Sequence, residues 1–200
     1  FLLQGVTGSG KTEVYLRLAE ETLQKGQQLI LLVPEVALTP QMIDSFGKKF
    51  PGQLEVLHSY LGAGEREHAW WRIKQGKASL ILGSRSALFA PVKNLGWIVM
   101  DEEHEPSYKQ ESTPYYHARE VAFEIARQTG AKILLGSATP SLETRHRVEE
   151  GKMVHLKLPR RIHHQTKTTI QIVDLREELR KKNISIFSEV LMEKIEKTLK

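Results

Sequence analysis

The chain of 200 residues contains no cysteine, so these residues form neither a disulfide bond nor a thiolate zinc site. Long hydrophobic runs are also missing. The longest, Leu29–Val33, is far shorter than the ~20 apolar residues of a membrane-spanning helix. No signal-peptide pattern, internal repeat or low-complexity segment is found. Because Phe1 opens inside an expected strand, we expect a piece of a longer protein without a membrane span. The absence of cysteine agrees with a reducing cytoplasm.

The composition is that of a globular domain. Hydrophobic residues make up 40% and charged residues 26% of the chain, and the length suits one α/β domain with its own core. The formal net charge of +5 favours polyanionic partners, but the same charge is common in proteins that bind no nucleic acid. Function must therefore be sought in motifs.

Residues 5–12 read Gly-Val-Thr-Gly-Ser-Gly-Lys-Thr and match the phosphate-loop pattern at each fixed position. Glycines allow backbone N–H groups to turn toward phosphate oxygens, Lys11 reaches the β/γ-phosphates, and the Thr12 hydroxyl ligates Mg²⁺. A glycine-rich turn that happens to carry a lysine is the alternative, disfavoured by the strand before it and the helix after it. The predicted nucleotide-binding residues are Gly5, Thr7, Gly8, Ser9, Gly10, Lys11 and Thr12.

A carboxylate cluster, Asp101-Glu102-Glu103-His104, follows the apolar run 97–100. A carboxylate after such a strand lies at the sheet edge where ligands bind in α/β proteins. We predict that Asp101 holds Mg²⁺ beside Thr12 and that Glu102 polarises the water that attacks the γ-phosphate. With Lys11, these are the predicted catalytic residues, and His104 is assigned to coupling. The alternative is a plain acidic loop.

Small hydroxyl residues follow another buried run, 133–135, in the segment Gly136-Ser137-Ala138-Thr139. Ser137 and Thr139 are placed to hydrogen-bond with the carboxylate cluster and report its state. Thr139 also fits as a helix cap before Pro140. Spacing alone leaves the two interpretations open.

Short β-branched runs alternate with helical patterns, which predicts an α/β fold with a mostly parallel sheet and helices on both faces. Expected strands are 1–4, 29–33, 54–57, 79–82, 97–100 and 132–135, with two weaker ones near 153–156 and 170–173. Expected helices are 11–25, 40–50, 65–76, 117–129, 140–150 and 187–199. Residues 159–169 are basic and aperiodic and are expected to form an exposed loop, as are residues 174–186.

Five segments occur in helicase order: residues 5–12, 33–41 (Val-Pro-Glu-Val-Ala-Leu-Thr-Pro-Gln), 83–89 (Gly-Ser-Arg-Ser-Ala-Leu-Phe), 101–104 and 136–140. They resemble motifs I, Ia, Ib, II and III of DEAH-like superfamily 2 helicases. Two segments resemble the PriA family of primosomal helicases. Residues 101–110 read Asp-Glu-Glu-His-Glu-Pro-Ser-Tyr-Lys-Gln, and residues 116–119 read Tyr-His-Ala-Arg. The resemblance is strong from residue 1 to about residue 158 and is looser from there to residue 200.

This resemblance implies the first of two RecA-like lobes of a P-loop NTPase, with ATP between them, in a helicase that moves 3′ to 5′ on single-stranded DNA and restarts stalled forks. Segments 33–41 and 83–89 then face DNA, through Thr39 and Arg85. Residues 107–119 are similar to an aromatic-rich loop that senses the strand. Tyr108 or Tyr115 is expected to be exposed and Tyr116 to pack. The predicted DNA contacts are Thr39, Arg85, Tyr108, Lys109, Tyr115 and Arg119.

The resemblance also defines what these residues lack. The implied domains are 1–158 as the ATP-binding lobe, 159–186 as connecting segments and 187–200 as a helix leading toward the second lobe. That lobe supplies a transition-state arginine, and the family's zinc module lies beyond Lys200. Implied partners are single-stranded and forked DNA, primosome proteins and single-strand-binding proteins. The fragment alone is expected to bind nucleotide weakly, with negligible hydrolysis and no unwinding.

Three other functions stay open at this point. A superfamily 2 translocase would move on duplex DNA without separating strands. A small phosphoryl transferase would need an acceptor pocket and a basic lid, and would leave the Asp-Glu-Glu-His cluster without a role. A pure binding module would use the nucleotide only to switch partner affinity.

Overall fold

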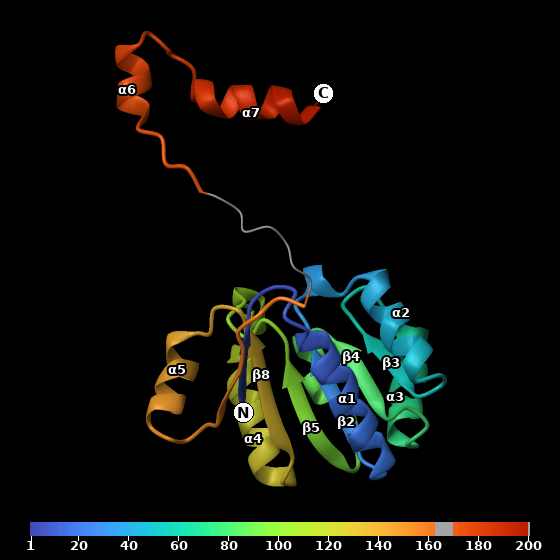
Figure 1. Cartoon of the computed structure of the whole chain (residues 1–200). Coiled ribbons are helices and arrows are strands. Elements are labelled where there is room, and N and C mark those ends of the chain that lie inside the picture. Colours follow the sequence, from blue (N-terminus) through green and yellow to red (C-terminus); the bar gives the residue numbers. More distant parts are fainter. Residues whose placement is uncertain (163–169, 200) are drawn as a thin grey trace. The chain divides into compact units, whose positions relative to one another are not determined.

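The computed structural model describes residues 1–162 and 170–199 (Figure 1). The chain divides into two compact units, residues 1–164 and 165–200. The first contains the sheet and every motif named above.

Seven parallel strands form the sheet of the first unit, in the order β3-β4-β2-β5-β8-β1-β9. Their bounds are β1 Leu2–Gly5, β2 Gln28–Leu32, β3 Leu54–Leu57, β4 Leu80–Gly83, β5 Leu95–Met100, β8 Lys132–Ser137 and β9 His155–Leu158. The central strands are apolar on both sides because both faces are covered, as parallel sheets require. The phosphate loop and the carboxylate cluster both follow carboxyl ends of strands and so lie at one edge of the sheet.

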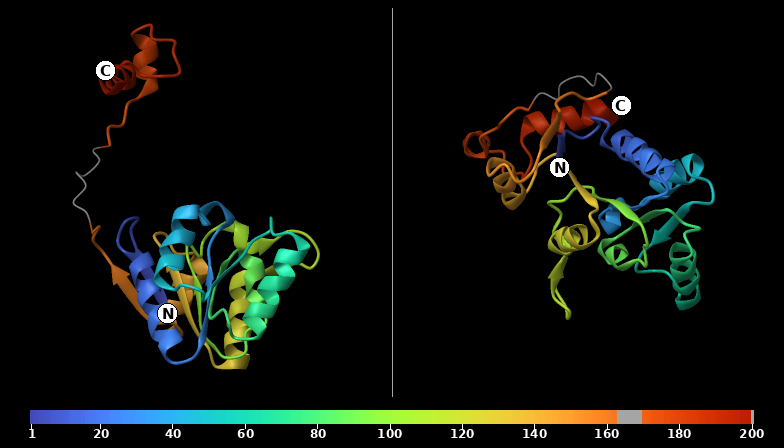
Figure 2. Two further views of the ribbon diagram at one scale, coloured as in Figure 1. Left: turned by 90° about the vertical axis from the view of Figure 1, so that its right-hand side faces the viewer. Right: turned by 90° about the horizontal axis from the view of Figure 1, so that it is seen from below.

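Helices cover both faces, as Figures 1 and 2 show. On one face, α1 (Lys11–Gln24) and α2 (Pro40–Lys49) bury Tyr15, Ala19 and Phe46 against the sheet. On the other, α3 (Ala63–Lys74) and α4 (Ala118–Thr129) bury Ile73, Ala118 and Ala122. α5 (Leu142–Glu149) follows β8. The predicted α/β fold is confirmed.

Local signals fix where several helices begin and end. The Thr39 hydroxyl accepts a hydrogen bond from the Met42 N–H at the start of α2, as its sequence predicts. Gly130, at φ 75°, ends α4 in the left-handed conformation that glycine adopts without strain. The start of α5 corrects our prediction, because Ser141 rather than Thr139 caps it. Thr139 is therefore free of the capping role that competed with coupling.

The expected helices and the first seven expected strands occur within two residues of their predicted ends. The strand expected at 170–173 is wrong, since residues 170–174 carry no regular structure. The short 3-10 helices η1 (Glu35–Ala37), η2 (Arg85–Phe89) and η3 (Pro106–Tyr108) were not expected. Nor was the two-stranded hairpin of β6 (Lys109–Gln110) and β7 (Tyr116–His117), which folds part of the predicted aromatic loop. Residues 163–169 of the expected basic loop lie outside the described residues.

The second unit contains α6 (Leu175–Arg180), which the sequence did not predict, and α7 (Glu189–Leu199). Asp174 caps α6, and the Glu178 carboxylate accepts hydrogen bonds from the Glu189 N–H and the Asn183 side chain. Within residues 170–199 no hydrophobic side chain is buried, and several large ones, such as Ile184, are more than 80% exposed. These residues therefore have no core of their own. In the described part of the chain, every helix is too short or too polar to span a membrane.

Candidate nucleotide-binding site

The phosphate loop connects β1 to α1 and is shaped by glycines in the left-handed region. Gly8 has φ 76° and Gly10 φ 92°, where a side chain would be strained. No side chain caps α1, so its first N–H groups are directed to the loop. Ser9 Oγ is buried without a hydrogen-bond partner among the described residues. An uncapped helix start with an orphaned buried hydroxyl fits a bound phosphate.

Lys11 is buried at the beginning of α1. Its Nζ donates to the Gly5 carbonyl over 3.1 Å and forms an ion pair with Glu102 Oε1 at 3.2 Å. The predicted phosphate-binding lysine and the predicted water-activating carboxylate are therefore in contact. Because a buried cation needs a negative partner, the phosphate of a bound nucleotide competes with Glu102 for Lys11.

Asp101, which precedes Glu102 in the chain, is held by two tyrosines. The Tyr15 hydroxyl donates to Asp101 Oδ1 over 2.8 Å, and the Tyr108 hydroxyl donates to the Asp101 carbonyl over 2.7 Å. Burial raises the pKa of the Asp101 carboxyl, and the Tyr15 hydrogen bond opposes that shift. Burial also raises the pKa of both tyrosines well above the ordinary value, so both remain donors. Neither tyrosine role was predicted, although Tyr15 shares the buried face of α1 with Lys11.

The turn after Asp101 is tight. Glu102 has φ 44°, a left-handed conformation that costs a non-glycine residue about 1–3 kcal/mol. The turn is held by the Glu103 N–H, which donates to the Gly136 carbonyl, and by the Glu105 N–H, which donates to the Glu102 carbonyl. Such strain is typical of functional turns, because the surrounding fold must maintain it.

The predicted coupling residues meet at this turn. His104 Nδ1 lies 2.8 Å from Ser137 Oγ and 3.7 Å from Glu102 Oε2. The Thr139 N–H donates to Ser137 Oγ over 3.0 Å, so Thr139 joins through its backbone. The contact between the two motifs is thus present, while its role in coupling stays a prediction.

Glu103 belongs to a buried polar cluster that the sequence did not reveal. Its side chain is 0% exposed and forms an ion pair with Arg119 at 3.2 Å. It also accepts hydrogen bonds from the Ser141 N–H at 2.7 Å, from Ser141 Oγ at 3.1 Å and from Thr144 Oγ1 at 2.9 Å. The cluster ties the carboxylate turn to the start of α4 and to the cap of α5.

Two of the predicted DNA contacts are wrong in this structure. Tyr108 is 1% exposed, with its hydroxyl committed to Asp101, and Arg119 is 6% exposed, with its guanidinium committed to Glu103. Both side chains instead hold the carboxylate turn, Tyr108 at Asp101 and Arg119 at Glu103. Aromatic and basic residues near a carboxylate motif look alike in sequence whether they face inward or outward, and only the packing separates the two cases.

The other four predicted DNA contacts are accessible. Thr39, Lys109 and Tyr115 are exposed, Tyr115 by 73%. Arg85 is partly exposed and donates from Nη1 to the carbonyls of Ser107 (2.6 Å) and Lys109 (3.3 Å), which joins η2 to the hairpin.

Of Tyr108 and Tyr115, one of which was expected to be exposed, Tyr115 is the exposed one. Tyr116 packs edge-to-face on Phe89 with ring centroids 5.5 Å apart, as expected.

The chemistry of the site fits a hydrated Mg²⁺. Such an ion takes one or two protein oxygens together with phosphate oxygens and water, and the Thr12 hydroxyl and Asp101 carboxylate are donors of that kind. Among residues 1–162 and 170–199, no group of three or more histidine or acidic side chains forms a protein-only metal site. Thr12 and Asp101 are the residues that would hold the ion when nucleotide is present.

Residues 1–148 match the family described as DEAD/DEAH box helicase. The chain belongs to the DEAD/DEAH box helicase family. A helicase domain of this family uses a nucleotide, which agrees with the phosphate loop. The chain is 50% identical over 199 residues to the replication restart protein PriA of Bacillus subtilis, covering 100% of this chain and 25% of that protein. It is 46% identical over 176 residues to PriA of Haemophilus influenzae, covering 88% and 24%.

Solved structures similar to this domain confirm its RecA-like fold. The Pyrococcus furiosus Hef helicase domain superimposes with a TM-score of 0.59 at 24% identity, covering 79% of this chain and 34% of that one. RecG bound to a three-way DNA junction superimposes with a TM-score of 0.57 at 22% identity, covering 83% and 21%. The chain spans about a quarter of the length of the curated relatives it matches.

Proposed function

We propose that this chain is the ATP-binding lobe of a 3′-to-5′ DNA helicase that acts in replication restart at stalled forks of bacterial cells. The observation that carries the proposal is the contact of Lys11, from the phosphate loop, with Glu102, the residue after Asp101. The likeness to replication restart proteins supplies the biological setting.

The ion pair of Lys11 with Glu102 suggests how the phosphates act on the carboxylate. In the contact seen here, Glu102 is held by Lys11. When the β/γ-phosphates take Lys11, Glu102 is released to orient and deprotonate the attacking water. Thr12 and Asp101 hold the Mg²⁺, which when bound neutralises charge on the phosphate oxygens. Tyr15 keeps Asp101 ionised and oriented for that task.

The remaining predicted residues serve to contact the DNA strand and to couple the nucleotide site to the second lobe. Thr39, Arg85, Lys109 and Tyr115 are accessible for phosphate contact or base stacking. The contact of His104 with Ser137 links Glu102 to the segment 136–140, through which the state of the nucleotide reaches the second lobe.

The parts that complete the motor lie outside these residues. Residues 170–199 expose their apolar side chains, which supports the helix at 187–200 as one that leads toward the second lobe. The zinc module belongs to the full chain, and primosome proteins and single-strand-binding protein are its partners. Without the second lobe's transition-state arginine, the fragment alone should bind ATP weakly and not unwind DNA.

The test measures ATP hydrolysis by the full-length parent with and without forked DNA. The Lys11→Ala variant of the same protein is the control. Strong stimulation by the fork that vanishes in Lys11→Ala supports the proposal. Turnover independent of DNA favours a transferase or a switch and refutes it. Unwinding of a labelled fork then separates a helicase from a translocase that leaves the duplex intact.

A further inference from the structure

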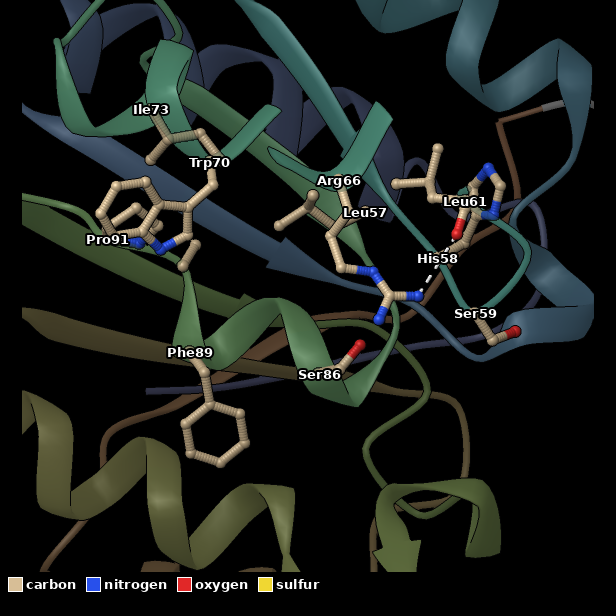
Figure 3. A pocket seen from close by; sticks show the side chains of 11 residues that line it. Leu57, His58, Ser59, Leu61, Arg66, Trp70, Ile73, Ser86, Phe89 and Pro91 are labelled. Carbon is tan, nitrogen blue, oxygen red and sulfur yellow. Dashed lines mark hydrogen bonds between the residues drawn. The ribbon is translucent and has the colours of Figure 1, made fainter. Parts of the chain in front are cut away.

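An apolar hollow of the first unit lies away from the nucleotide site. A cavity of about 380 Å³ lies between α3 and η2, beside the loop that follows β3 (Figure 3). Its volume falls within the ~300–1,000 Å³ of small-ligand pockets. Both flanking segments follow carboxyl ends of strands, so the cavity opens at the edge that also carries the motifs.

The cavity has a flat apolar end and a polar end. Figure 3 shows the Trp70 indole beside Ile73 and Pro91 at one end. At the other end, the Arg66 guanidinium extends from α3 toward Ser86 and donates from Nη2 to the Leu61 carbonyl over 3.3 Å. Trp70 is 39% exposed, so part of its ring is available to a ligand.

The polar end offers hydrogen-bond donors. Arg66 lines the cavity, and no carboxylate within residues 1–162 and 170–199 forms an ion pair with it. Apart from the Nη2 bond to Leu61, its guanidinium can donate to a ligand. Ser86 Oγ makes only a marginal contact, at 3.5 Å to Ser84 Oγ. A ligand matched to these walls is planar and aromatic, and bears acceptor atoms on one edge.

We propose that this cavity receives one base of the DNA strand, stacked on Trp70 with its carbonyl or ring-nitrogen edge toward Arg66 and Ser86. The inference rests on the proposed function and deepens it. η2 supplies both Arg85, a predicted phosphate contact, and Ser86, a wall of the cavity, so a strand that reaches Arg85 passes the cavity mouth. Every base has a face that stacks on indole, so such a site tolerates any sequence.

The chain contains a matched control for Trp70. Trp71 is the next residue of the same helix, is 45% exposed, and does not line the cavity. The two indoles touch edge-to-face with centroids 5.0 Å apart, and Lys74 lies over both rings. Removing either ring therefore disturbs similar neighbours, but only Trp70 forms a wall of the cavity.

The experiment compares two ligands of the full-length parent: a short oligothymidylate and an abasic oligomer of the same length, which keeps only the phosphate backbone. We expect Trp70→Ala to weaken binding of oligothymidylate by roughly tenfold, in the range of one lost base stack. Binding of the abasic oligomer should be unchanged, which also reports that the variant is folded. Trp71→Ala should alter neither affinity, and Trp70→Phe should restore most of the loss.

Equal weakening of both ligands by Trp70→Ala would mean that the indole acts through the fold, and would overturn the inference. Unchanged binding of both oligomers by Trp70→Ala would overturn the inference as well. If the unsubstituted protein binds neither ligand, the proposed function fails along with it. If the unsubstituted protein binds both ligands but Trp70→Ala has no selective effect on oligothymidylate, the base-site inference fails while the proposed function stands.

Discussion

Replacing Arg119 by methionine removes the cation beside the buried Glu103 carboxylate while nearly preserving side-chain volume. The Arg119 side chain is 7% and the Glu103 side chain 0% exposed, so neither gains appreciable solvation when its partner is lost. Removing one member of a buried ion pair costs about 3–5 kcal/mol, because the other charge stays buried and uncompensated. Glu103 would keep its bonds to Ser141 and Thr144, which places the expected loss near the lower limit, about 3 kcal/mol.

The assay is urea unfolding of the 200-residue chain followed by tryptophan fluorescence. Its tryptophans, at 70, 71 and 97, all lie in the first unit, so the signal reports that unit alone. Arg127→Ala is the matched control on the same helix. Arg127 pairs with Glu124 at 2.7 Å, but its side chain is 73% exposed, and such surface pairs contribute only about 0–1 kcal/mol.

Adding Glu103→Gln to Arg119→Met tests the reason for the loss. A neutral amide no longer leaves a buried charge unpaired, so the double variant should recover a large part of the lost stability. A loss in Arg119→Met no greater than that in Arg127→Ala would refute the reasoning. Failure of Glu103→Gln to restore stability would locate the cost in packing rather than in charge.

Three further predictions concern the site. In the full-length parent, Glu102→Gln should keep nucleotide affinity and abolish turnover; unchanged turnover would remove Glu102 as the water-activating group. Tyr15→Phe removes the hydrogen bond that opposes the raised pKa of Asp101, so Mg²⁺-dependent nucleotide binding should weaken. Tyr108→Phe, which loses a bond only to the Asp101 carbonyl, should leave that binding nearly intact, and equal weakening in both variants would contradict the assignment. Burial, followed by the charge of Arg119, lowers the pKa of His117 in the folded chain. As pH falls through the ordinary histidine pKa of about 6.5, the unfolded chain therefore takes up a proton at His117 before the folded chain does. The free energy of unfolding should therefore fall as pH falls through that value, and His117→Asn should flatten the dependence in urea unfolding at pH about 7.5 and about 5.5.

The nucleotide motifs could be located without coordinates because each is a short, continuous segment. Gly8 and Gly10 are needed where the backbone is left-handed, and Asp101 is placed by the buried strand before it. The Thr39 cap could be predicted for the same reason, since its partner, the Met42 N–H, lies three residues away. Local geometry of this kind is encoded by local sequence.

Contacts between distant segments were not readable. The Tyr15–Asp101 bond joins residues 86 positions apart, and the Glu103–Thr144 bond joins residues 41 apart. The resemblance of residues 107–119 to a DNA-sensing loop assigns Arg119 to DNA, whereas the start of α4 turns it inward to Glu103. The spacing of Lys11 and Tyr15, one helical turn apart, was the one available sign that Tyr15 faces the same side of α1.

The sequence by itself determined the family, the α/β alternation and the identity of the phosphate and carboxylate motifs, because strands, helices and loops of this kind follow from residue order and periodicity. The tertiary structure alone decided which polar side chains are buried, that Lys11 is paired with Glu102, and that Trp70 and Arg66 line a cavity. Those features depend on the register of seven parallel strands, which brings loops from distant parts of the chain to one edge of the sheet.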